Sequence, residues 1–332
     1  MSLPKTELEK LNHIDCLNIA GRAIPLLPYW DGESWHGWVI KDNQLIDFHP
    51  HDVRQGEYFG VKAAEENDII LPFIEFFWQH ASWPDLFMLY YRISDDIQNL
   101  LTSLAKIDHF FITRDSIGSG VSFFVATEIE YLITVSRSIF DLLQEIISVI
   151  WKTHIILIDQ NAQQMKDKMH LPKSFKDILI TNNRLRTKEE IIAKYHFIDE
   201  LASFYSNIGE FFFCLRSYRD DLIHLGVVLD YIYSTEKGFC VDIKRKPFSL
   251  FNIWKDEYKY NDHIYSLRPF LAHIMCYTIG SCNAFIDVIR RTIQFPEPLT
   301  SKCRVYNRYF NNSSIITYFE VSRNNIIWWS IE

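Results

Sequence analysis

The fold that the sequence predicts is decided by residues 196–226, which read HFIDELASFYSNIGEFFFCLRSYRDDLIHLG. Apolar side chains recur at helical spacing in this stretch, so we expect one long helix from about His196 to His224. Its inward stripe consists of Phe204, Ile208, Phe211, Leu215, Tyr218 and Leu222. The polar residues of the last two turns fall on the opposite face, and a loop with Gly226 follows.

Three further segments carry the same helical period. One begins at about residue 92 with Ser94–Asp96 as its expected N-cap, one runs from Gly120 to about Thr153, and one spans about Asp262 to Gln294. Long apolar helices must bury their stripes against one another. We therefore expect a mainly α fold built on a bundle of four long helices.

Alternating segments around turn residues predict β-hairpins outside this bundle. The expected hairpins are Trp35–Lys41 with Gln44–Phe48, Val227–Tyr233 with Phe239–Ile243, and a C-terminal pair on either side of Asn311–Ser313. The chain accordingly divides into an aromatic-rich N-terminal extension (1–90), a helical domain (91–295) and a β-hairpin tail (296–332).

Composition restricts the class of protein. The 332 residues are 48% hydrophobic and 23% charged, which is typical of a soluble globular protein. The apolar runs are short and interrupted, and the N-terminus lacks an apolar signal segment, so we expect neither a membrane span nor secretion. The net charge of -8 argues against a surface coated by nucleic acid but allows a local basic groove.

The six cysteines form no Cys-x-x-Cys pair, and several lie in apolar stretches. Such spacing is typical of buried free thiols in a reducing compartment and not of a disulfide framework or a zinc site. We therefore expect a cytoplasmic protein.

The end of the helix at 196–224 carries the most specific chemistry. Arg216, Arg219, Asp220 and His224 share its polar face, because residues three, four, seven and eight apart lie together. Arginines provide fixed donors for phosphate oxygens, and a carboxylate one turn from an imidazole favours its protonated form. This set can hold a phosphate and move a proton without a metal.

Spacing alone is a weak signal here, because the chain contains a second Arg-x4-His match at Arg268–His273. In that match proline follows the arginine and the other residues are apolar. We interpret it as a coincidence near a helix start.

With an acidic residue after Arg219, a helix end and a following glycine loop, residues 92–294 resemble the HEPN superfamily. Its pattern is Arg, a polar residue (Asn, Asp or His), about three residues, then His. Residues 136–143 also look like the early HEPN helix that faces the motif. The resemblance implies a HEPN-like bundle and metal-independent RNA cleavage, with the ribose 2′-hydroxyl as nucleophile. Arg219 would stabilise the phosphate, His224 would transfer the proton, and Asp220 would orient or tune the imidazole.

The resemblance further implies a homodimer formed through the motif helices. It suggests a toxin or phage-defence effector, with an antitoxin protein as an expected partner. Many HEPN members lack activity, so an inactive helical scaffold that binds a protein partner is the alternative function. A third interpretation is that the motif is only the polar end of a helix and has no function of its own.

We expect supporting or structural roles for other polar groups. Asp141 and Glu145 form a ladder with Arg137 and either pair within their helix or position the motif. Lys244, Arg245 and Lys246 are the expected RNA-binding cluster, because they follow the motif closely in sequence. The stretch His49–Asp52 predicts a turn, since two histidines beside a proline give no ligand geometry by themselves. We expect no metal and no cofactor.

Overall fold

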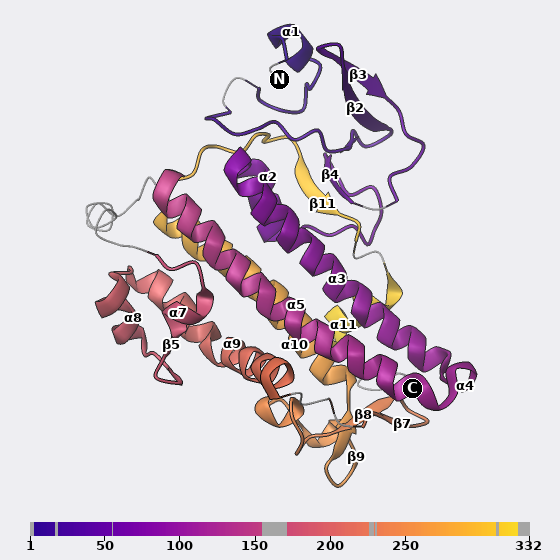
Figure 1. The fold of residues 1–332 in the computed structure, drawn as a ribbon. Coiled ribbons are helices and arrows are strands. Elements are labelled where there is room, and N and C mark those ends of the chain that lie inside the picture. The colour runs from indigo at the N-terminus through magenta and orange to yellow at the C-terminus, as the bar shows by residue number, and fades with distance from the viewer. Residues whose placement is uncertain are drawn as a thin grey trace.

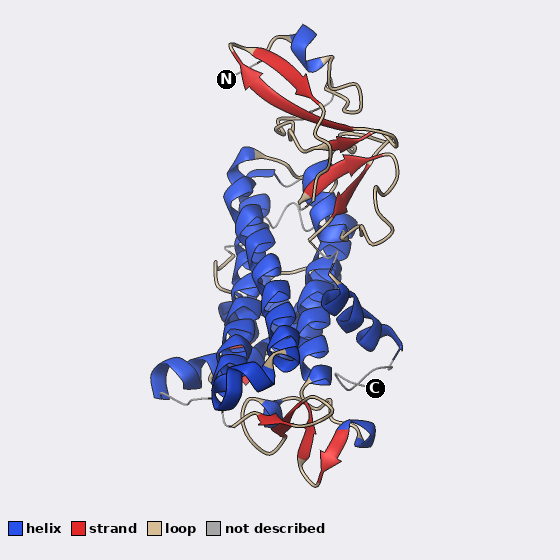
Figure 2. Cartoon of the chain, turned by 90° about the vertical axis from the view of Figure 1, so that its right-hand side faces the viewer, coloured by secondary structure: helices blue, strands red, loops and turns tan. Residues whose placement is uncertain are grey.

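Four long helices form the centre of the protein, and β-structure lies at both ends (Figures 1 and 2). They are α3 (Phe87–Ile112), α5 (Val121–Val149), α9 (Asp199–Leu225) and α10 (Arg268–Thr292). α5 packs against α3, α9 and α10, and α10 also packs against α3 and α9. The described part of the chain is therefore mainly α, as the helical period predicts.

The computed structural model describes residues 3–16, 19–54, 56–154, 171–225, 229, 231–309 and 312–324. Within the helices that end at 225 and 324, the side chains of residues 223–225 and 321–324 fall outside this description.

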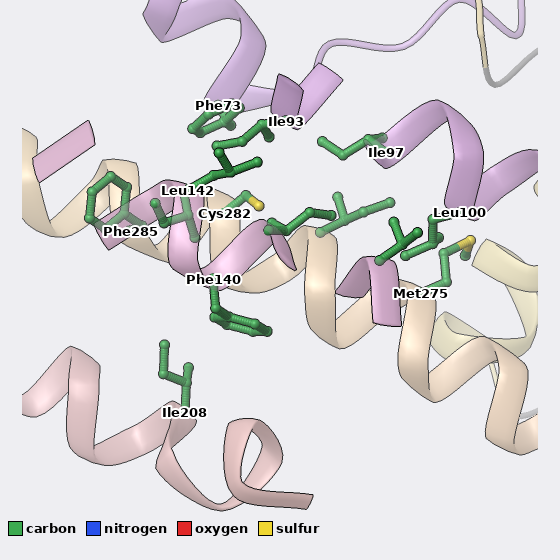
Figure 3. Close-up of a cluster of buried hydrophobic side chains, with 14 of the residues drawn as sticks. Phe73, Ile93, Ile97, Leu100, Phe140, Leu142, Ile208, Met275, Cys282 and Phe285 are labelled. Carbon is green, nitrogen blue, oxygen red and sulfur yellow. The ribbon is translucent and has the colours of Figure 1, made fainter. Parts of the chain in front are cut away.

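The hydrophobic core lies where the central helices meet α2 (Pro72–His80) (Figure 3). α5 contributes most, because its buried apolar side chains cover about half of its circumference, whereas Phe123, Thr127 and Thr134 on the other side are exposed. Side chains from five helices converge there, among them Phe73, Ile93, Leu100, Phe140, Ile208, Met275 and Phe285.

α3 begins earlier than the sequence predicts. A 3-10 turn at Pro84–Leu86 leads directly into the helix at Phe87, and no side chain caps its N-terminus. The expected cap at Ser94–Asp96 is wrong, because Ser94 is buried inside the helix and its hydroxyl donates to Glu57 Oε1 at 3.1 Å. The sequence suggests a helix N-cap at Ser94, whereas the hydroxyl of this serine serves as a partner for the buried carboxylate of Glu57.

The fourth long helix begins at Arg268, six residues after its predicted start. The preceding residues form β9 (Lys259–Asn261) and β10 (Ile264–Ser266), which pair around a tight turn. Together with β7 (Tyr233–Ser234) and β8 (Phe239–Asp242) they form a sheet in the order β7-β8-β10-β9. Of the hairpin expected after the motif helix, the second strand is present as β8, whereas the first is confined to Tyr233–Ser234 (β7). Leu229, Tyr231 and Ile232 are not in a strand, and residues 227, 228 and 230 lie outside the described residues.

The N-terminal hairpin is confirmed at its predicted residues. β2 (Trp35–Lys41) pairs with β3 (Gln44–Phe48), and the connecting residues Asp42 and Asn43 have φ values of 51° and 58°. These values suit a two-residue turn with positive φ at both positions, which aspartate and asparagine tolerate.

The predicted C-terminal β-hairpin is wrong. β11 (Arg304–Asn307) pairs with β4 (Glu57–Gly60), so the sheet order is β11-β4-β1-β2-β3, with β1 at Tyr29–Trp30. The second half of the expected hairpin is the helix α11 (Ser313–Asn324), which packs on α10 and α3. Ile315 and Tyr318, three residues apart, are its buried contacts. The first and last parts of the chain therefore share one sheet.

The remaining elements are short. They comprise α1 (Lys5–Leu8), α4 (Arg114–Ile117), α7 (Phe175–Leu179), α8 (Lys188–Tyr195) and the two-residue strands β5 (Ile180–Thr181) and β6 (Arg184–Leu185). α5 continues as a π-helical turn at Ile150–His154. 3-10 turns occupy Gly118–Gly120, Phe248–Leu250 and Asp256–Tyr258.

One helix of the described residues, α10, has the length and apolar composition of a membrane span. However, 56% of its most apolar window is buried inside the protein, and it contacts α2, α3, α5, α9 and α11. Packing within the core therefore accounts for its composition.

The first prediction concerns the junction of α5, α7 and α9. Phe140 is fully buried, and its ring contacts those of Phe175, Phe211 and Phe212. We expect Phe140→Ala to lower the free energy of unfolding by about 3–5 kcal/mol, because it leaves a cavity among aromatic rings.

Urea denaturation measures this loss. Phe123→Ala on the same helix is the control, since Phe123 is 71% exposed, and it should change stability by less than about 0.5 kcal/mol. Equal losses in the two variants would contradict the packing described here.

Candidate functional site

The last turns of α9 have an apolar face and a polar face, as the sequence predicts. Of the expected inward stripe, Phe204, Ile208, Phe211, Leu215 and Tyr218 are buried and Leu222 is partly buried. Arg216, Arg219 and Asp220 on the other face expose 19%, 32% and 29% of their side chains. The polar stripe is thus half-buried against the protein and not fully turned to solvent.

Asp220 holds the two arginines of its own helix. Its Oδ2 lies 2.8 Å from Nη2 of Arg216, one turn earlier, and its Oδ1 lies 3.5 Å from Nη1 of Arg219. The carboxylate of Asp220 therefore organises guanidinium groups. The role expected for it toward the imidazole of His224 concerns a side chain outside the described residues.

α5 brings a second arginine–carboxylate pair to the same surface. Arg137 Nη1 lies 2.6 Å from Asp141 Oδ2, and the backbone N–H of Phe175 donates to Asp141 Oδ1 at 3.1 Å. Burial raises the pKa of Asp141, while the positive charges of Arg137 and Arg219 oppose that shift. Asp141 is therefore within electrostatic range of Arg219.

Glu145, the other expected supporting residue, lies with a different partner. Its Oε1 is 3.7 Å from Nζ of Lys173, and both side chains are partly or largely exposed. Of the predicted ladder, Arg137 and Asp141 thus join the motif surface, and Glu145 pairs with the segment before α7.

The basic stretch Lys244–Lys246 forms an exposed turn after β8 that approaches α9. Lys246 Nζ lies 2.6 Å from Asp221 Oδ2, and Arg245 Nε lies 3.9 Å from Asp242 Oδ2. The structure therefore brings Lys246 next to the motif, although Asp221 balances its charge. The sequence did not predict this pair, because the two residues are 25 positions apart and nothing in their spacing links them.

His224 is part of α9, one helical turn after Asp220. Its side chain falls outside the described residues, so the described geometry of the site consists of the arginines and carboxylates around it.

The second Arg-x4-His match is structural. Arg268 begins α10 and pairs with Asp108 at 3.4 Å, with both side chains 11% exposed. His273 packs edge-on against Phe211 and Phe251. The match is thus part of the core around a helix start.

A separate polar cluster lies in the N-terminal sheet, at residues that no sequence motif joins. His36 comes from β2, Asp47 comes from β3 and His49 directly follows β3, and their potential ligand atoms lie within 4.8 Å of one another. The hairpin register could have revealed them, because Trp38 pairs with Asp47 and alternate residues share a face. The expected turn at His49–Asp52 instead contributes His49 to this cluster and Asp52 to an ion pair with Arg308.

Neither a protein-family model, nor a curated protein, nor a solved structure matches this chain. Function must therefore be argued from the residues and their geometry.

The second prediction concerns the pH dependence of stability. Burial lowers the pKa of His273 to about 4, whereas an imidazole in an unfolded chain titrates near 6.5. As the pH falls, the unfolded chain takes up the proton first. The stability that His273 contributes is thus fully present above about pH 6.5 and is lost as the pH falls toward about 4.

Urea unfolding of the wild type and His273→Phe at pH 7.5 and pH 4.5 tests this. The wild type should lose about 2 kcal/mol more than the variant on acidification, allowing for the partial exposure of the ring. His13 and His80 also have lowered pKa values, but they are present in both proteins. Their contributions to the pH dependence of stability therefore cancel when the two proteins are compared. Parallel losses would contradict the burial of a neutral His273.

Proposed function

We propose that this protein is a metal-independent endoribonuclease of HEPN type, acting through Arg219 and His224. The observation that supports the proposal is the convergence of Arg137, Arg216 and Arg219 on one half-buried surface of α5 and α9, where Asp141 and Asp220 pair with them. Several guanidinium groups in a partly desolvated place favour a phosphate.

The arginines also retain unused donors. Within the described part of the chain, the Nε atoms of Arg137 and Arg219 are buried without a hydrogen-bond partner. Buried donors of this kind are usually satisfied by water or by an ion, and an RNA phosphate brings acceptor oxygens to the same surface.

The four long helices provide the frame that such a site needs, since they fix α9 against α5 and α10. We assign the proton transfer to His224 and the stabilisation of phosphate charge to Arg219. Attack of the 2′-hydroxyl on phosphorus breaks the bond to the 5′ oxygen and leaves a 2′,3′-cyclic phosphate. Asp220 and Asp141 hold the arginines, and Lys244–Lys246 extend the basic surface toward the RNA.

The proposal includes a homodimer in which two motif helices form one cleft. It further includes a cytoplasmic role as a toxin or defence effector, with an antitoxin protein as partner.

The third prediction is cleavage of RNA in the presence of EDTA, with 2′,3′-cyclic phosphate and 5′-hydroxyl ends. His224→Ala and Arg219→Ala should each reduce the rate by about 100-fold or more, the usual contribution of a general acid–base group or an electrostatic stabiliser. Arg219→Lys should recover little activity, because an ammonium lacks the planar fork of a guanidinium.

His109→Ala is the matched control, since His109 is an exposed histidine in the last turn of α3 and is not part of the proposed site. It should cleave like the wild type. Light scattering of the same samples measures the dimer. Cleavage that survives His224→Ala or requires a divalent metal would refute the nuclease, and an inactive, monomeric chain would favour the helical scaffold.

A further inference from the structure

The cluster formed by His36, Asp47 and His49 has the donor set of a transition-metal site. We propose that these three side chains bind one divalent cation of the zinc class at the β2–β3 hairpin. Two imidazole nitrogens and one carboxylate form a common three-ligand set for such metals and leave a coordination position for water.

The distances suit this assignment. Asp47 Oδ2 lies 3.2 Å from Nδ1 of His36 and 3.9 Å from Nε2 of His49. A tetrahedral zinc with bonds of about 2.0–2.1 Å separates its ligand atoms by about 3.3 Å. The cluster therefore needs a small inward movement of His49, which is 62% exposed and has room to turn.

The hydrogen bonds around the cluster fix the ring nitrogen that each histidine offers. Nε2 of His36 lies 3.2 Å from Asp31 Oδ2, and Nδ1 of His49 lies 3.1 Å from the carbonyl oxygen of Trp35. A carboxylate and a carbonyl can only accept, so those two nitrogens donate to them. Nδ1 of His36 faces the carboxylate of Asp47 at 3.2 Å in the same way, and a bound cation would take the place of the proton between them. The nitrogens that face Asp47 are then the ones available to a metal, the arrangement that outer partners of metal-binding histidines usually impose.

Asp31 is itself held rigidly. Its Oδ1 accepts from the backbone N–H groups of Glu33 at 2.8 Å and Ser34 at 2.7 Å, and its Oδ2 accepts from the Ser34 hydroxyl at 3.0 Å. This turn, which connects β1 to β2, thus positions the carboxylate that orients His36.

Aromatic rings form one wall of the cluster. Tyr29 lies opposite His36 in the β1–β2 pairing, and Trp38 stacks beside it with ring centroids 6.2 Å apart. His13 is sandwiched against Tyr29 and Trp38 at 4.1 Å and 5.0 Å. The ligand-bearing face of the hairpin is therefore built on a packed aromatic layer, which limits the freedom of His36.

The proposal does not depend on the nuclease. The hairpin lies at one end of the molecule and the motif end of α9 lies toward the other (Figure 1). Chelation should therefore remove a metal from the hairpin and leave metal-independent RNA cleavage unchanged.

Calorimetry on the untagged full-length chain, stripped with a chelator, tests the site with Zn²⁺ as the probe. We expect one equivalent to bind, and Co²⁺ to give the visible absorption of a low-coordinate nitrogen–oxygen site. His49→Ala and Asp47→Asn should each weaken binding by more than about 100-fold, since outer partners alone are worth about 10- to 100-fold. Asp31→Asn, which alters only the hydrogen-bond partner of His36, should weaken binding by about 10- to 100-fold.

His51→Ala is the control, because His51 is an exposed histidine two residues from His49 and is not part of the cluster. It should bind like the wild type, and circular dichroism should show that all variants fold. The site is refuted by an absence of stoichiometric binding, by unchanged binding in His49→Ala, or by equal losses in His49→Ala and His51→Ala. If no metal binds stoichiometrically, His36 acts only as an ionic bridge between Asp31 and Asp47.

Discussion

Enclosure of α5 is the constraint on which the rest of the structure depends. Its buried side chains, among them Ile133, Val135, Phe140 and Leu142, spread over about half of its circumference and are at most 8% exposed. Each such side chain contributes about 1.5–3 kcal/mol when it leaves water, so the helix is stable only with neighbours along that broad face. α3, α9 and α10 supply them, and the β-structure occupies the two ends that remain.

Enclosure also decides where charge can lie between α5 and α9. Arg137 and Asp141 fall at the edge of the buried face of α5, opposite Arg216, Arg219 and Asp220. Half-buried charges are costly unless they are paired, which is why each carboxylate lies against a guanidinium. The same packing leaves the Nε atoms of Arg137 and Arg219 buried without a hydrogen-bond partner in the described part of the chain. Structural pairing and the proposed phosphate binding are thus compatible uses of one set of residues.

The sequence predicts the parts of this structure that depend on local period. The long helices and the β2–β3 hairpin follow from apolar spacing and from Asp42-Asn43, and the shared polar face of Arg216, Arg219 and Asp220 follows from helical geometry. The C-terminal tail is misjudged because the partner of β11 is β4, more than 240 residues away. The β-branched residues of 313–324 suggest a strand, whereas burial of Ile315 and Tyr318 against α10 and α3 favours a helix. Two contacts depend on tertiary packing, so no spacing rule reveals them: that of Asp141 with Phe175 and that of Lys246 with Asp221.

That long-range sheet also bears on the cluster of His36, Asp47 and His49. Arg308, just after β11, is 5% exposed and donates from Nε to Asp68 at 3.0 Å and from Nη1 to Asp52 at 3.0 Å. Its guanidinium lies 5.1 Å from the ring centroid of Trp35, the residue whose carbonyl accepts from His49. A buried arginine with several partners resists displacement, because any shift leaves a charge unpaired. Arg308, just after the C-terminal strand, therefore holds the hairpin at Trp35, while the turn at Asp31 holds the ring of His36. A ligand set held from two directions is pre-organised for a cation in a way that two histidines beside a proline, considered alone, are not.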